Sequence, residues 1–109
     1  MIKGMSLVKR KPGLTLAEFA RHYEEIHVPL ALKHFLFKKY MRNYIDKPED
    51  AEEPWFDCIT EVWFETMEDC QAAAEFSVSE SYKVIAEDEE KFMDRSKIVA
   101  FIVEERATL

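Results

Sequence analysis

The chain contains few of the residues that build glycine-rich loops or disulfide frameworks. Among its 109 residues are two glycines, Gly4 and Gly13, and two cysteines, Cys58 and Cys70. A Rossmann fingerprint or a P-loop needs several glycines at fixed spacing, so the sequence excludes nucleotide binding by those routes. Two cysteines are too few for a disulfide framework or a zinc site, and we expect both to be free thiols.

Long apolar segments are also missing. No apolar run approaches 18 residues, and no basic segment followed by an apolar one opens the chain, so we expect a soluble, cytoplasmic protein without membrane contact. Leu, Ile, Val and Phe nevertheless number 29, too many for a disordered segment. At this length, the sequence predicts a single globular domain over residues 1–109.

Positive charge is scarce overall and unevenly distributed. Fifteen basic and 22 acidic side chains give a net charge of −7, which argues against nucleic acid as a partner. Residues 1–47 carry ten basic and four acidic side chains, whereas residues 48–109 carry five and eighteen. We expect these oppositely charged halves to pair within the fold or across a dimer, although the basic half could also steer an anionic ligand.

The first half of the chain predicts a strand, a helix and a second strand. Residues 2–10 predict the first strand, and Thr15 with Glu18 forms a capping box that starts the helix. We expect Pro29 to break or bend this helix, with a second helical piece to about residue 37 and a strand over 40–45. The inward face of the helix is expected to carry residues at spacings of three and four: Phe19, Tyr23, Ile26, His27 and Leu30.

The second half repeats this order after an acidic, proline-flanked loop at residues 46–54. Residues 57–65 are rich in branched and aromatic side chains and predict the clearest strand. Thr66 caps a helix to about residue 76, and Ser79 starts another to about residue 92. Residues 98–104 predict the last strand.

Two βαβ units close naturally into a ferredoxin-like α+β fold, a four-stranded antiparallel sheet with helices on one face. The strand at 57–65 has apolar side chains on both faces, so the face that the helices leave bare is not suited to water. A chain this short cannot cover that face itself. We therefore expect a homodimer in which one sheet packs on the other.

Several segments resemble the EthD family. Residues 9–19 (KRKPGLTLAEF) and 22–31 (HYEEIHVPLA) resemble the opening of that family, residues 56–64 (FDCITEVWF) its central strand, and residues 85–96 (IAEDEEKFMDRS) its closing segment. The resemblance covers nearly the whole chain, and the His-Val-Pro-Leu element starting at His27 is its most specific part. It implies a dimeric α+β barrel, in agreement with the pattern of elements.

The resemblance implies less about chemistry. Relatives include small cofactor-free enzymes that dehydrate, decarboxylate or cyclise aromatic polyketide intermediates, and muconolactone-type isomerases and quinone-forming monooxygenases share the barrel. We therefore expect a cofactor-independent lyase or cyclase acting on an aromatic polyketide or a related β-keto acid. The alternatives are a cofactor-free oxygenase acting on an anthrone or hydroquinone, and a ligand-binding dimer without catalysis.

His27 is the main catalytic candidate. It lies four residues after Tyr23 and eight after Phe19, on the apolar helix face, where a histidine is ordinarily a satisfied core residue. Its place in the family element favours a proton-shuttling role. The spacings of five and seven between the three histidines do not suit a metal site, so we expect neither metal nor organic cofactor.

The other candidates depend on which face of each strand lines the pocket. We expect Tyr44 and Glu61 to assist His27 in catalysis. Structural roles remain open for these and other residues. The aromatic residues could simply form the core, and Asp88, Asp94 and Arg95 could form structural ion pairs. His34 follows the proline and has no predictable direction, and Cys58 lacks an assured base. The expected substrate-binding residues are Tyr23, Tyr40, Trp63, His22 and Asp57.

Overall fold

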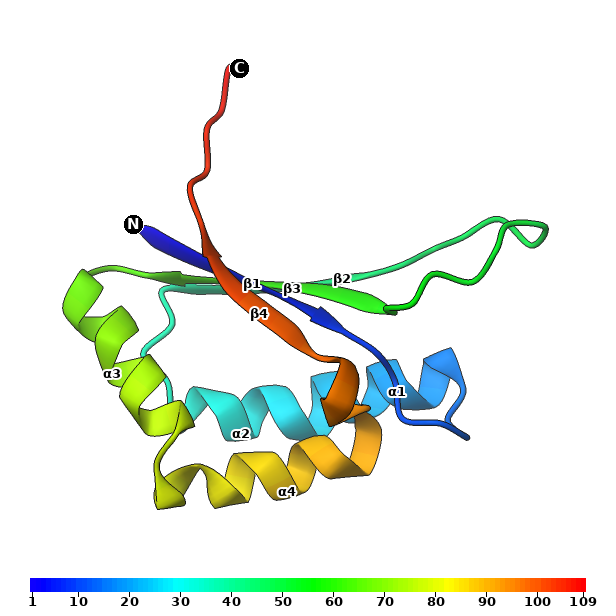
Figure 1. Cartoon of the computed structure of the whole chain (residues 1–109), viewed down its shortest axis with the longest axis horizontal. Coiled ribbons are helices and arrows are strands. Elements are labelled where there is room, and N and C mark those ends of the chain that lie inside the picture. The colour runs from blue at the N-terminus through cyan, green and yellow to red at the C-terminus, as the bar shows by residue number, and fades with distance from the viewer.

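A computed structural model describes all residues, 1–109, and shows a four-stranded antiparallel sheet with the helices on one side (Figure 1). The α+β, ferredoxin-like fold predicted from the sequence is confirmed. The strands run in the spatial order β2-β3-β1-β4. The elements are β1 (Ile2–Val8), α1 (Leu16–His22), the π-helical turn η1 (Tyr23–His27), α2 (Val28–Leu32), β2 (Lys39–Tyr44), β3 (Cys58–Phe64), α3 (Met67–Ser77), the 3₁₀ turn η2 (Glu80–Tyr82), α4 (Lys83–Phe92), the 3₁₀ turn η3 (Arg95–Lys97) and β4 (Val99–Val103).

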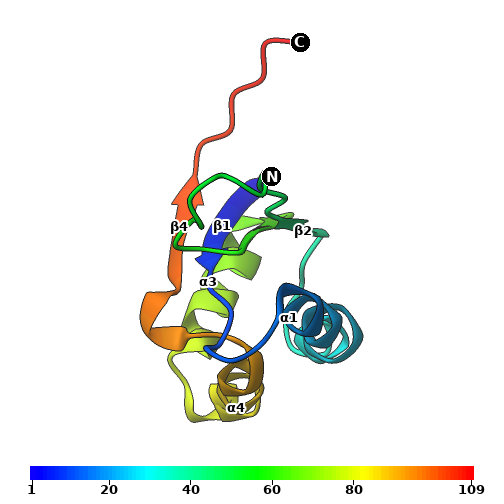
Figure 2. The same ribbon diagram turned by 90° about the vertical axis from the view of Figure 1, so that its right-hand side faces the viewer.

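The strand register divides the sheet into two faces. Gly4 pairs with Val62 and Ile102, and Val8 pairs with Cys58, so these side-chain positions share the inner face that the helices cover. Alternation places the intervening residues on the outer face, away from the helices. Figure 2 shows the same division from the side, with α1 and α4 both below the sheet.

The first helix begins as the sequence predicts. The Glu18 backbone N–H donates to the Thr15 hydroxyl at 3.1 Å, and the Thr15 N–H donates to the Glu18 carboxylate at 2.9 Å, which completes a capping box. Of the break or bend predicted at Pro29, the structure shows no break. A π-helical turn, in which the Val28 N–H donates to the Tyr23 carbonyl, leads directly into α2 with Pro29 in its first turn, where the missing N–H is tolerated. The helix ends at Leu32, before the predicted residue 37.

The inward face of this helix differs from the predicted set: Ile26 and Leu30 are not buried, and Ala31, which was not predicted, is buried. Phe19, Tyr23, His27 and Ala31 follow one another at steps of four residues and are all buried. Ile26 was expected among them, but its side chain is 52% exposed. The buried positions are spaced four residues apart through the π turn. Ile26, three positions after Tyr23, therefore points towards solvent.

Pairs of charges join the two oppositely charged halves of the chain, as the sequence predicts. Lys3 Nζ lies 2.7 Å from a Glu61 carboxylate oxygen, and Arg10 lies 2.8 Å from Glu53. The acidic excess of the second half is therefore partly neutralised within the fold.

The outer face of the sheet carries apolar side chains that no helix of the chain covers. Met41 on β2 and Val99 and Phe101 on β4 are each more than 40% exposed, and Leu7 and Ile59 lie between them on the central strands. Residues 104–109 extend away on this side (Figure 1). Among the helices, none has the length and apolar character needed to cross a bilayer.

Candidate functional site

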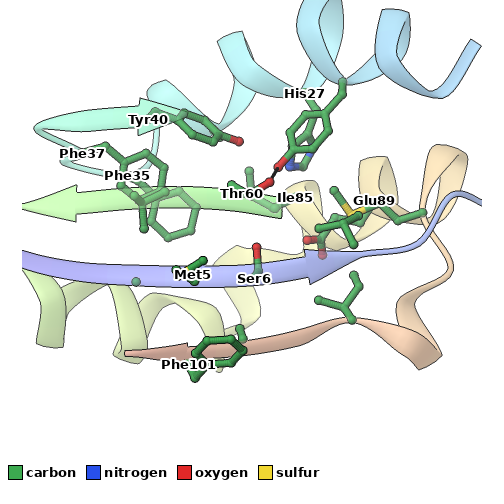
Figure 3. A pocket seen from close by; sticks show the side chains of 18 of the residues that line it. Met5, Ser6, His27, Phe35, Phe37, Tyr40, Thr60, Ile85, Glu89 and Phe101 are labelled. Carbon is green, nitrogen blue, oxygen red and sulfur yellow. Dashed lines mark hydrogen bonds between the residues drawn. The ribbon is translucent and has the colours of Figure 1, made fainter. Parts of the chain in front are cut away.

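A cavity of about 410 Å³ lies between the inner sheet face and the helices (Figure 3). Sixteen of its 21 lining residues are hydrophobic, as expected of a site for an apolar ligand. Gly4 contributes to the room inside, because a Cβ there would lie only 3.2 Å from a Val62 methyl group. Polar side-chain groups come from Ser6, His27, Thr60 and Glu89, and from the hydroxyls of three tyrosines counted among the hydrophobic residues, Tyr23, Tyr40 and Tyr82.

The imidazole of His27 is held in one orientation by Asp88. His27 ends the π turn and is 5% exposed, and its Nδ1 lies 2.8 Å from Asp88 Oδ2. A carboxylate accepts hydrogen bonds, so this contact places the ring proton on Nδ1. No protein group is hydrogen-bonded to Nε2. The ring therefore offers an unshared electron pair where His27 lines the cavity.

The surroundings of His27 favour its neutral form. Burial lowers the pKa of His27 below its usual value near 6.5, and the hydrogen bond and charge of Asp88 oppose that effect only in part. Near neutral pH the imidazole is therefore uncharged, with its proton on Nδ1 beside Asp88, and Nε2 can act as a base.

Tyr23 and Tyr40 supply hydroxyl groups to the same cavity. The Tyr23 hydroxyl is hydrogen-bonded to the Thr60 hydroxyl at 2.7 Å, which fixes its ring beside His27. Burial raises the pKa of Tyr40 to about 12, so its hydroxyl keeps its proton at neutral pH and can donate a hydrogen bond. Both residues were predicted to bind substrate, and both line the cavity.

Glu89 adds an acidic group to the cavity wall. The Tyr82 hydroxyl donates to Glu89 Oε2 at 3.0 Å, and Arg95 Nε lies 3.5 Å from Oε1. Burial raises the pKa of Glu89 above its usual value of 4.5, and the negative charge of Asp88 adds to the increase. The carboxyl group is thus easier to protonate than an exposed glutamate.

Asp88 and Glu89 were not among the predicted site residues. Ile85, Asp88 and Phe92 lie at spacings of three and four on α4, and all three are buried. An aspartate inside an apolar helical pattern was the signal that could have identified the partner of His27. The structural ion pair predicted for Arg95 is confirmed, with Glu89 and Glu90 as its partners. Asp88 instead contacts His22 and His27, and Asp94 accepts hydrogen bonds from Ser96.

The predictions that Glu61 is catalytic and that Trp63 binds substrate are wrong for this cavity. Both residues alternate with Thr60 and Val62 on β3 and therefore lie on the outer sheet face. Glu61 is paired with Lys3 at 2.7 Å. The Lys3 ammonium also lies over the Trp63 ring, 4.7 Å from its centroid. The helices cover the other face, which the apolar pattern of β3 could not reveal.

Tyr44, Asp57 and His22 also lie outside the cavity lining, contrary to their predicted roles. The Tyr44 hydroxyl donates to Glu24 at 2.5 Å. Asp57 is buried and accepts from the Arg10 backbone N–H at 2.8 Å, so it holds the end of β1. His22 Nε2 lies 2.9 Å from Asp88 Oδ1, and its ring stacks on Phe92, so it acts on the site only through Asp88.

Two further expectations concern possible metal and thiol chemistry. No group of three or more His, Cys, Asp or Glu side chains is arranged to hold a metal ion. His34 is exposed and stacks on Phe76, away from His27. Both cysteines are free, and burial raises the pKa of Cys58 to about 11, which makes it a poor nucleophile.

Comparisons with known proteins identify both family and fold. A family model described as the EthD domain matches residues 11–96. The chain is similar to the structure of an EthD family protein from Bacillus halodurans, with 22% identity, a TM-score of 0.68, and coverage of 97% of this chain and 100% of that one.

Two other structures share the fold at lower identity. One is a dimeric protein of unknown function with a ferredoxin-like fold from Bacteroides fragilis (10% identity, TM-score 0.62, 95% of both chains). Another is a dimeric ferredoxin-like protein of unknown function from Thermobifida fusca (12% identity, TM-score 0.55, 94% of this chain and 88% of that one). Among curated proteins, no sequence matches this chain.

Proposed function

The chain belongs to the EthD family, and from that premise we propose that it is a cofactor-independent lyase or cyclase acting on an aromatic polyketide or a related β-keto acid. One observation carries the proposal: His27, oriented by Asp88, lines an apolar cavity with its Nε2 free of protein partners. An oriented neutral imidazole beside an apolar cavity is suited to general acid–base catalysis.

The proposed reaction begins with the removal of a proton next to a substrate carbonyl. His27 Nε2 takes the proton, the C–H electron pair forms a C=C bond, and the carbonyl electron pair moves onto oxygen to give an enolate. The Tyr40 hydroxyl donates a hydrogen bond to that oxygen. Asp88 stabilises the imidazolium through Nδ1, as its 2.8 Å contact allows.

The enolate then has two productive fates. In a dehydration, it collapses to a conjugated enone as the β-hydroxyl leaves with the proton from His27, releasing water. In a cyclisation, its carbon attacks a second carbonyl, and His27 returns the proton to the new alkoxide. For a β-keto acid, loss of carbon dioxide forms the same enolate directly, and His27 must then enter the cycle protonated.

A deuterium-exchange experiment distinguishes this proposal from its alternatives. We expect the protein to exchange the methyl protons of 2-acetylnaphthalene in D₂O, as followed by NMR, because enolisation is the common first step. Binding of this ketone without exchange would support a non-catalytic ligand-binding protein. Oxygen-dependent conversion of anthrone to anthraquinone, without ketone exchange, would support the oxygenase.

The pH dependence of exchange follows from the lowered pKa of His27. The base must be neutral to take a proton, and the neutral form persists down to the pKa of the folded protein, which lies below 6.5. We therefore expect the exchange rate to be above half of its maximum at pH 6.5 and to reach half of it only at lower pH. A rate already halved well above pH 6.5 would contradict this assignment of the base.

We also propose that two chains form a homodimer through their outer sheet faces. The apolar side chains on that face have no cover within the chain, and two structurally similar proteins are described as dimeric. We expect light scattering to give twice the mass of the 12.9 kDa chain. Ile59→Glu should produce a monomer, because it would bury a charge in the interface.

Leu36 provides the matched control for this test. Its side chain is 70% exposed in the loop between α2 and β2, outside the four strands of the sheet. Leu36→Glu should therefore leave the dimer intact. A monomeric parent protein, or an Ile59→Glu variant that remains dimeric, would contradict the proposed interface.

A further inference from the structure

The cavity differs from most sites for organic acids in the charges around it. No lysine or arginine is among its 21 lining residues, and its single acidic lining residue is Glu89. Two basic side chains of the sheet are engaged elsewhere. Arg42 forms an ion pair with Glu24 at 2.7 Å, and Lys3 lies on the outer face between Glu61 and Glu105.

Arg95 is the cation nearest to the acidic group of the cavity, but it is not free to receive an anion. Its guanidinium lies 3.5 Å from both Glu89 and Glu90, so two carboxylates already share one positive charge. The side chain of Arg95 is 43% exposed and lies outside the lining. A carboxylate placed in the cavity would therefore lose its hydration without gaining a lysine or arginine partner, and burial lowers the pKa of His27, which favours its uncharged form.

We infer that the cavity selects uncharged aromatic carbonyl compounds over the corresponding carboxylates, and that Glu89 is the residue that excludes the anion. When Glu89 is protonated, its O–H is available to donate to a ligand carbonyl. When it is ionised, it repels a ligand carboxylate across an apolar space in which charges are poorly screened. Both states favour the neutral ligand, and the aromatic lining suits a flat ring system.

This inference rests on the proposed function only in taking the cavity as the ligand site. It narrows the substrate class to aromatic ketones or esters and disfavours free β-keto acids. Within the proposed chemistry, it therefore favours dehydration and cyclisation over decarboxylation. It also opposes the expectation that the basic half of the chain steers an anionic ligand into the site.

Calorimetry with two probes of similar shape tests the selectivity directly. We expect the parent protein to bind 2-acetylnaphthalene about tenfold or more tightly than 2-naphthoate at pH 7, because burying an unpaired carboxylate is costly. Glu89→Gln should strengthen naphthoate binding several-fold and so lower the preference for the ketone. Glu90→Gln is the control, because it removes the same charge from the neighbouring, exposed position and also lies beside Arg95.

Each contrary result overturns the inference. Naphthoate binding as tight as ketone binding would show that the cavity accepts anions, and binding of neither probe would show that it is not the expected ligand site. An equal change in selectivity in both variants would remove the specific role of Glu89. The ratio of the two affinities is measured on the parent protein, so this part of the test does not depend on whether the variants fold. These binding measurements require no turnover. The selectivity can therefore be confirmed even if His27 proves not to be a catalytic base, and the catalytic role can be confirmed even if the selectivity is wrong.

Discussion

Replacing His27 by glutamine should lower the rate of ketone proton exchange by about 10²- to 10⁴-fold, the usual contribution of a general base. Glutamine keeps a side-chain amide that can donate to Asp88, so the contact seen at 2.8 Å has a substitute. It has no basic nitrogen to face the cavity. Circular dichroism melting and exchange should be measured on the same preparation, with His27→Ala as a second variant.

The exposed histidine at position 34 provides the control for this experiment. His34→Gln makes the same change outside the cavity, where the ring only stacks on Phe76, and should retain full exchange activity. If His27→Gln melts normally and keeps full activity, His27 is a structural residue. Loss of packing alone would lower the free energy of unfolding by about 1–3 kcal/mol, which the melting curve would show.

Replacing Asp88 by asparagine should reduce exchange by a factor comparable to that of His27→Gln. The asparagine amide can donate to Nδ1, which moves the ring proton to Nε2 and removes the electron pair from the cavity side. If the variant retains some activity, the fall of its exchange rate at acid pH should shift to lower pH. The reason is that the charge and hydrogen bond of Asp88 raise the pKa of His27, and the variant lacks that charge. A purely structural role for Asp88 would not move the pH profile.

Two further variants separate the position of Asp88 from its charge. Glu87→Gln removes the same charge from the preceding, exposed residue of α4 and should leave the rate and profile unchanged. His22→Gln removes the other partner of Asp88, 2.9 Å from Oδ1, and should have a smaller effect than Asp88→Asn. Equal losses in Glu87→Gln and Asp88→Asn would contradict the positioning role.

Local patterns in the sequence predicted the elements because local interactions determine them. The capping box at Thr15 and Glu18, the branched residues of β3 and the repeated βαβ order each depend on residues close in the chain. The same patterns placed His27 on the inward helix face. The π turn could not be predicted from the spacing of apolar residues. Its buried residues lie four positions apart, and the same spacing occurs on one face of an α-helix.

The amino-acid sequence by itself determined the four-stranded α+β fold, the inward direction of His27 and the apolar character of both sheet faces. Only the tertiary structure decided which face of β3 borders the cavity, and so removed Glu61 and Trp63 from the site and kept Tyr40 in it. It also joined His27 to Asp88, 61 residues later. Alternation along a strand has the same period on either face, and a contact between distant segments leaves no local pattern, so these outcomes depend on how the helices pack against the sheet.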